Sequence, residues 1–160
     1  LLAAGYACAT AEDREPAISA GAAAELYQTS ALIHDDILDA ASTRRSQPSA
    51  HVALARLHSS SGWSGDRAHF GTSSAILLGD FLLSLSTEAF ADACAQVGPR
   101  AGRAALRAFA RMTTEVAFGQ YLDIRAENGP PPIQSAPPCP SSPTRARGTP
   151  WCFRCASAHS

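Results

Sequence analysis

The sequence contains no lysine, so all 13 of its basic residues are arginine. This absence removes lysine as a candidate nucleophile or phosphate ligand. The formal net charge is −1 at pH 7, which gives no indication of nonspecific nucleic-acid binding. No apolar run reaches the length needed to span a bilayer, and the opening LLAAGYACAT lacks the charged leader of a signal peptide. We therefore expect a cytoplasmic protein with no membrane span.

Cysteines and prolines are concentrated near the C-terminal end. Residues 128–160 hold eight of the 11 prolines and three of the five cysteines, whereas residues 1–127 are rich in alanine and leucine. We predict that residues 1–127 form a partial helical domain and that residues 128–160 are disordered, because they contain too little apolar surface to fold. An alternative is that this tail results from translation in a shifted frame of GC-rich DNA, and the abrupt change of composition after Asn128 favours it. The CFRC at 152–155 has no partner pair and is weak evidence for zinc.

Hydrophobic periodicity predicts an all-α fold. Helices are expected over 15–40, 72–96 and 99–127, with a shorter one around 51–58 and the end of a buried helix over 1–10. Thr72 or Ser73 is the expected N-cap of the 72–96 helix, which is apolar nearly all round. The stretch SSSGWSG predicts a flexible connection. No segment is convincing as a strand.

The most informative stretch is LIHDDILDAASTRR, residues 32–45. On a helix, Asp35 and Asp39 share a face and Asp36 lies beside them. Carboxylates at a helix C-terminus repel one another and meet the negative end of the helix dipole. Mg²⁺ would neutralise them, and Arg44 and Arg45 are suited to phosphate oxygens. The pattern therefore predicts a metal-bridged diphosphate.

The alternative is a solvated acidic helix end, paired with the two arginines, in a soluble helical domain of another function. For a bare DDxxD that alternative would be favoured. Here the neighbours Ala31, Leu32 and Ile33 are small or apolar, which indicates carboxylates set into a helix that faces a core.

HDDILDAASTRRSQPSAH resembles the first aspartate-rich motif of the trans-isoprenyl diphosphate synthases, also called polyprenyl synthetases. ELYQTSALIHDD, FGTSSAILLGDFLLS and GQYLDI resemble, in the same order, the helix that leads into the motif, a core helix with a Gly–Asp pair, and a helix that carries Gln and Asp to the site. These matches cover most of residues 1–127. The resemblance implies part of an isoprenoid-synthase helical bundle around a deep pocket, dimeric in the intact family.

The resemblance also implies a Mg²⁺-dependent prenyltransferase of isoprenoid biosynthesis that joins isopentenyl diphosphate to an allylic prenyl diphosphate. Bound Mg²⁺ would neutralise the leaving diphosphate, so that the allylic carbon–oxygen bond ionises. The implied metal ligands are Asp35, Asp36 and Asp39. The implied diphosphate ligands are Arg44 (allylic), Arg45 (isopentenyl), Gln28 and His51; the implied pocket residues are Gln120 and Asp123.

For two of these residues a structural role is about as compatible with the sequence: His51 as a surface or capping histidine, and Gln120 as a buried polar contact. Asp80 lies in an apolar helix and needs a partner, so we expect a structural role for it. In the family, side chains upstream of the aspartates form the floor of the pocket. Ser30 and Ala31 are small, and Tyr27, which would lie deeper in the pocket, is large. This pattern suggests a geranylgeranyl or longer product, although Tyr27 could equally be an ordinary core residue.

Parts of the family pattern have no counterpart here. The upstream segment with Lys and Arg and the second aspartate-rich motif are missing, so the chain is interpreted as truncated at both ends, with little or no turnover expected. A second interpretation is a non-catalytic small subunit or partner of a heteromeric synthase. Terpene cyclases share an aspartate-rich motif, but the paired arginines directly after it favour chain elongation.

Overall fold

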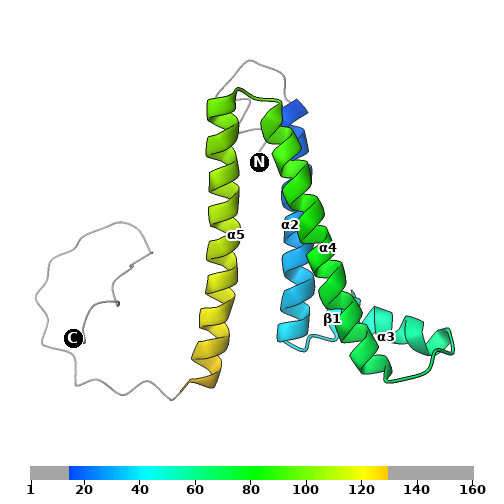
Figure 1. Cartoon of the computed structure of the whole chain (residues 1–160). Helices are drawn as coiled ribbons and strands as arrows, with labels where there is room; N and C mark the ends of the chain where they lie inside the picture. The colour runs from blue at the N-terminus through cyan, green and yellow to red at the C-terminus, as the bar shows by residue number, and fades with distance from the viewer. Residues whose placement is uncertain (1–14, 130–160) are drawn as a thin grey trace, which may run out of the picture. The chain divides into compact units, whose positions relative to one another are not determined.

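The structure, a computed structural model, describes residues 15–129 and is helical over most of that range (Figure 1). Its elements are α2 (Glu15–Leu38), β1 (Thr43–Arg44), β2 (Gln47–Pro48), α3 (Ala50–Ser60), α4 (Arg67–Ala95) and α5 (Pro99–Asn128). This confirms the all-α prediction. The helix end expected over 1–10 and nearly all of the predicted tail, from residue 130 on, lie outside the described residues.

The chain divides into two compact units, Leu1–Tyr121 and Leu122–Ser160, and the boundary falls within α5. Of the second unit the structure describes the last turns of α5 and Gly129. Everything that follows on packing and on the site concerns the first unit.

Helix α2 ends two residues earlier than predicted. Ala40 adopts a left-handed conformation with φ 51°, and the Ala41 N–H donates to the Asp36 carbonyl oxygen at 2.9 Å. The Ala40 N–H donates to the Ile37 carbonyl oxygen at 3.2 Å, which completes a Schellman motif. As a result Asp39 lies beyond the helix that carries Asp35 and Asp36.

The expectation that the chain has no strands is wrong. β1 and β2 pair antiparallel, with Thr43 opposite Pro48 and Arg44 opposite Gln47. The linking residues Arg45 and Ser46 both have positive φ, 51° and 64°, which is typical of a two-residue type I′ turn. The strands are too short to show alternation, and the turn lacks the glycine that usually marks such a hairpin.

The connection between α3 and α4 is held by aromatic contacts rather than being a flexible insertion. The buried His58 ring lies 5.0 Å from the Phe70 ring and 5.9 Å from the Trp63 ring, between centroids. His58 Nε2 lies 3.2 Å from the Ser64 carbonyl oxygen. The sequence prediction considered composition alone and missed these contacts.

The N-cap of α4 is Asp66, not Thr72 or Ser73, and the helix begins five residues before the predicted start. The Asp66 carboxylate accepts hydrogen bonds from the N–H groups of Ala68 and His69, at 2.7 and 3.3 Å. These bonds lower the pKa of Asp66 below its ordinary value. The first turn of α4 is polar, so hydrophobic periodicity did not reveal it.

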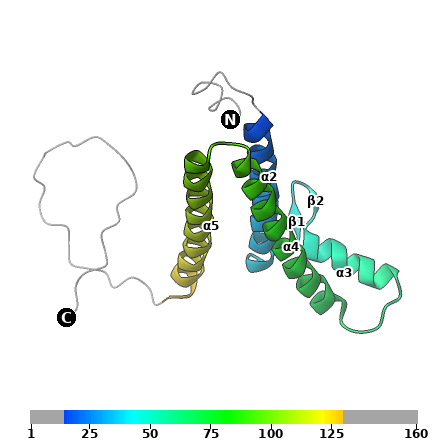
Figure 2. The same ribbon diagram turned by 45° about the horizontal axis from the view of Figure 1, so that its top comes forward.

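Helices α2 and α4 lie side by side, and α3 packs against α4 (Figures 1 and 2). The α2–α4 interface is made of small residues. The Ser30 hydroxyl donates to the Gly79 carbonyl oxygen at 2.7 Å, and the Ser86 hydroxyl donates to the Ala23 carbonyl oxygen at 2.8 Å. Side chains this small let the two backbones approach closely, and each buried hydroxyl has a backbone carbonyl oxygen as its hydrogen-bond acceptor.

Many large apolar side chains are exposed in the described part of the chain. Ile18 is 54% exposed, Leu77 69% and Phe81 59%. By length and composition alone α4 could also cross a membrane, contrary to the sequence-based expectation. One such helix is weak evidence for a membrane span, and α4 packs against α2 and α3.

Candidate active site

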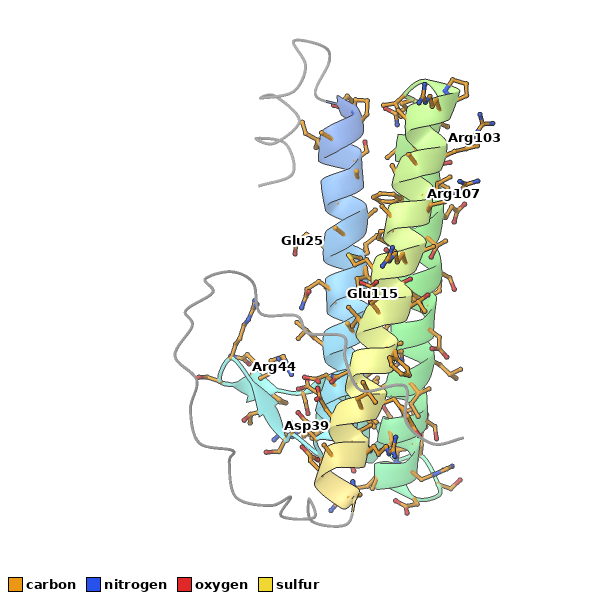
Figure 3. The ribbon with its side chains drawn as sticks, turned by 90° about the vertical axis from the view of Figure 1, so that its left-hand side faces the viewer. Glu25, Asp39, Arg44, Arg103, Arg107 and Glu115 are labelled. Carbon is orange, nitrogen blue, oxygen red and sulfur yellow. The ribbon has the colours of Figure 1, made fainter. Side chains whose placement is uncertain are left out.

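Two of the predicted aspartates meet one of the predicted arginines. The Arg44 Nε–H donates to Asp36 Oδ1 at 2.7 Å, and its Nη2 donates to Asp35 Oδ2 at 2.9 Å. The hairpin brings Arg44 back alongside the end of α2 (Figure 3). These bonds, the one to Asp36 first, raise the pKa of Arg44. The Asp36 side chain is only 5% exposed, so its charge is balanced mainly by this guanidinium.

Gln120 joins this group from α5. Its side-chain amide donates to Asp35 Oδ1 by a short hydrogen bond. Asp35 is thus held between a charged donor on the hairpin and a neutral donor on a helix 85 residues away in sequence. Of the four oxygens of Asp35 and Asp36, three accept hydrogen bonds from Arg44 or Gln120.

Asp39 and Arg45 are not part of this group. Asp39 is exposed, and Arg45 is an exposed residue of the hairpin turn. Within residues 15–129, no three acidic, histidine or cysteine side chains are placed to hold one metal ion. The hydrogen bonds therefore bring together Asp35 and Asp36, and the role of Asp39 as a metal ligand stays a prediction.

A cavity of about 570 Å³ begins at this group. Its lining comes from α2, α4 and α5: Tyr27, Ser30, Ala31, His34, Asp35, Leu38, Leu83, Thr113, Thr114, Val116, Ala117 and Gln120. The lining is largely apolar away from Asp35 and Gln120. The chain-length residues expected from the sequence, Tyr27, Ser30 and Ala31, all lie in it.

The cavity follows α2 and α5, which run in the same direction. Asp35 lies at the level of Gln120, and Tyr27 lies at the level of Phe109, where the ring centroids are 5.8 Å apart. From Asp35 to Tyr27 the helix rises about 12 Å. Burial raises the pKa of the Tyr27 hydroxyl. The site is a polar mouth with a channel beneath it.

Sequence reasoning missed the α5 wall and His34. Thr113, Ala117 and Gln120 recur at helical spacing, so the signal was available once Gln120 had been chosen. His34 Nε2 lies 3.3 Å from the Ile76 carbonyl oxygen and 3.5 Å from Asp80 Oδ1. The apolar neighbours of Asp80 suggested that its side chain is enclosed. Instead this side chain is 61% exposed, and it faces His34 across the α2–α4 interface.

The remaining predicted residues lie elsewhere. Gln28 is exposed on α2 and does not line the cavity. His51 is half-buried in the first turn of α3, with its Nδ1 3.3 Å from the Ser49 hydroxyl. Asp123 is exposed on α5 and belongs to the second compact unit. Their assigned roles stay predictions.

The model of the polyprenyl synthetase family matches residues 1–134. A short chain isoprenyl diphosphate synthase of Methanocaldococcus jannaschii is 30% identical over 123 residues, which cover 77% of this chain and 32% of that protein. A geranylgeranyl diphosphate synthase of Saccharolobus solfataricus is 31% identical over 116 residues, which cover 72% and 30%.

A solved geranylgeranyl pyrophosphate synthase of Corynebacterium glutamicum, complexed with isoprenyl diphosphate and magnesium, superposes with a TM-score of 0.71 and 38% identity, covering 79% of this chain and 35% of that one. The chain spans about a third of the length of these relatives. Because the family model matches residues 1–134 of the 160, the chain belongs to the polyprenyl synthetase family.

Proposed function

We propose that this chain supplies the allylic half of a Mg²⁺-dependent prenyl diphosphate synthase, which condenses isopentenyl diphosphate with an allylic prenyl diphosphate. One observation carries the proposal: Asp35, which accepts hydrogen bonds from Arg44 and Gln120, lines one end of a largely apolar cavity, and the adjacent Asp36 accepts a second hydrogen bond from Arg44. A charged mouth above an apolar channel fits an amphiphile with an anionic head and a hydrocarbon tail.

The donor set fits Mg²⁺. This ion prefers oxygen ligands, keeps several waters and usually takes one or two protein carboxylates together with substrate phosphates. Asp35 and Asp36 already hold one cation, the Arg44 guanidinium, so their position suits positive charge. When bound, Mg²⁺ would neutralise the negative charge of the departing diphosphate. Asp39 is the further ligand that family resemblance suggests.

The chain's own residues would bind the allylic substrate and orient it. Arg44 offers a fork of N–H donors suited to diphosphate oxygens. Gln120 fixes the orientation of the Asp35 carboxylate, which sets the direction of its free lone pairs. The apolar walls, among them Leu83 and Val116, would hold the hydrocarbon tail away from water.

The size of the product follows from the lining of the channel. Ser30 and Ala31 leave room next to the carboxylates, and Tyr27 is the largest side chain at the far end. This arrangement supports a product of geranylgeranyl length or somewhat longer, with Tyr27 as the stop. We also propose that the assembled enzyme is a cytoplasmic homodimer; the exposed Leu77 and Phe81 of α4 provide apolar surface that another protein segment could cover.

Calorimetric titration of the 160-residue chain with farnesyl thiodiphosphate, with and without Mg²⁺, tests the proposal. We expect Mg²⁺-dependent binding that Asp35→Ala abolishes. Asp92→Ala is the matched control, because Asp92 is an exposed aspartate of α4 that does not line the cavity. Equal binding by Asp35→Ala and the control chain would contradict the proposal.

Turnover is a separate question. We expect little or no incorporation of radiolabelled isopentenyl diphosphate, and incorporation at the rate of full-length relatives would contradict that expectation. The second candidate, a non-catalytic subunit of a heteromeric synthase, is favoured by the incomplete acidic group among the described residues. Co-purification with a complete synthase would support it.

A further inference from the structure

We propose that Phe109, held by Phe90, sets the longest prenyl chain that the cavity accepts by fixing the position of the Tyr27 ring. This inference rests on the proposed function and extends it to residues that do not touch the substrate. Phe109 and Phe90 would be positioning residues that act through Tyr27.

Three aromatic rings from three helices meet just below the cavity. Tyr27 of α2 and Phe109 of α5 contact edge to face, with centroids 5.8 Å apart and planes at 70°. Phe109 stacks on Phe90 of α4 at 4.2 Å and 14°. Phe109 is 8% exposed, and of the three rings only Tyr27 lines the cavity. The two phenylalanines therefore form a second layer behind the tyrosine.

Packing alone holds the Tyr27 ring. Within the described residues its hydroxyl makes no hydrogen bond, so no polar contact fixes its side-chain torsions. Edge-to-face aromatic contacts favour one relative orientation, and the neighbour that makes this contact is Phe109. Removing the Phe109 ring would open space into which the Tyr27 ring can move.

If the Tyr27 ring moves aside, little on α2 closes the channel. One turn further from the mouth, α2 carries Ala23 and Ala24, which are too small to block a hydrocarbon chain. The limit on chain length thus depends on the three-ring contact as a whole. A substitution behind the wall should lengthen the accepted chain while Tyr27 itself is retained.

The test measures affinity against chain length. Geranyl, farnesyl, geranylgeranyl and geranylfarnesyl thiodiphosphates are titrated calorimetrically into the full chain with Mg²⁺. For the unsubstituted chain we expect affinity to rise with length and then to fall once the tail no longer fits. In Phe109→Ala the fall moves to a tail at least one isoprene unit longer, and that longer tail binds about tenfold or more tightly than to the unsubstituted chain.

Two further variants separate positioning from general damage. In Tyr27→Ala, adding Phe109→Ala should change the length profile no further, because the two residues act through one contact. Phe118→Ala is the matched control: Phe118 is on the same helix, 57% exposed and outside the cavity lining, so its profile should match that of the unsubstituted chain.

Circular dichroism checks that each variant is helical, and Phe109→Leu, a smaller volume change, serves if Phe109→Ala unfolds. If the unsubstituted chain binds none of the four thiodiphosphates, the proposed function fails. If it binds them but folded Phe109→Ala, or Phe109→Leu in its place, keeps the original length profile, the positioning role of Phe109 is overturned while the proposed function stands.

Discussion

Replacing Arg44 with glutamine should tighten the binding of Mg²⁺ alone, although Arg44 is proposed to help bind substrate. In the structure, Arg44 donates to one oxygen of Asp35 and one of Asp36, and Gln120 donates to the other Asp35 oxygen. Asp36 Oδ2 is the oxygen left over. A cation that needs both carboxylates must therefore displace the guanidinium or bind beside it.

The magnitude follows from the charge that is removed. The Arg44 side chain is 35% exposed and the Asp36 side chain 5%, so water screens their interaction only in part. A metal ion that binds both carboxylates must break a charge-assisted hydrogen bond of Arg44, and such a bond corresponds to about 10–100-fold in affinity. Because Arg44 competes with the metal, we expect Arg44→Gln to raise Mg²⁺ affinity by about tenfold in the absence of diphosphate.

With a prenyl thiodiphosphate present the sign should reverse. Arg44 would then be free to donate to the diphosphate, and the loss of a charged hydrogen bond costs about 10–100-fold in affinity. Calorimetric titration of Mg²⁺ alone, and of farnesyl thiodiphosphate at saturating Mg²⁺, measures both effects. Arg56→Gln is the control, because Arg56 is exposed on α3 and forms no ion pair with any described residue. A weaker or unchanged Mg²⁺ affinity in Arg44→Gln would refute the competition.

Three predictions on stability follow from the backbone and the packing, each measured by thermal or urea unfolding. Ala40→Gly and Ser46→Gly should each stabilise the fold by roughly 0.5–1 kcal/mol, because both residues have positive φ and glycine adopts it without strain; destabilisation by either would contradict the assigned conformation. Gly71→Ala should destabilise by about 1–3 kcal/mol, since a Cβ there would overlap the backbone carbonyl oxygen of His51 on α3; an unchanged midpoint would show that α3 and α4 can move apart without cost. Asp66→Ala should lower the unfolding midpoint at neutral pH. The pKa of Asp66 is lower in the folded state, so its contribution is present above the ordinary Asp pKa of about 3.9 and is lost as the pH falls through the folded-state value. A difference that persists at lower pH would exclude the carboxylate cap as its source.

The acidic part of the site could be predicted because its signal is local. Asp35, Asp36 and Arg44 lie within ten residues of one another, and the need for a counter-charge is visible in the sequence alone. The sequence identified the source of that counter-charge only in part. The sequence suggested a metal and a diphosphate, and the structure shows that Arg44 balances one of the two negative charges.

The hairpin that delivers Arg44 could not be predicted. Its strands have two residues each, and its turn places Arg45 and Ser46 at positive φ without the glycine that marks type I′ turns. The family resemblance pointed to Gln120 of α5, but the pairing of Gln120 with Asp35 was equally hidden. Gln120 meets Asp35 across 85 residues, and a single sequence contains no information on which distant polar groups will pair.

The helix interface shows why hydrophobicity located the helices but not their buried faces. Large apolar residues at helical spacing include Ile18, Leu77 and Leu78, and these are exposed in the part of the chain that the structure describes. The contact between α2 and α4 is instead made by Ser30, Gly79 and Ser86, which hydrophobicity scales disregard. Close packing needs little side-chain volume, provided that each buried hydroxyl finds an acceptor. Small residues thus bring α4 against α2, and the larger side chains remain available to form the walls of a channel and to meet other surfaces.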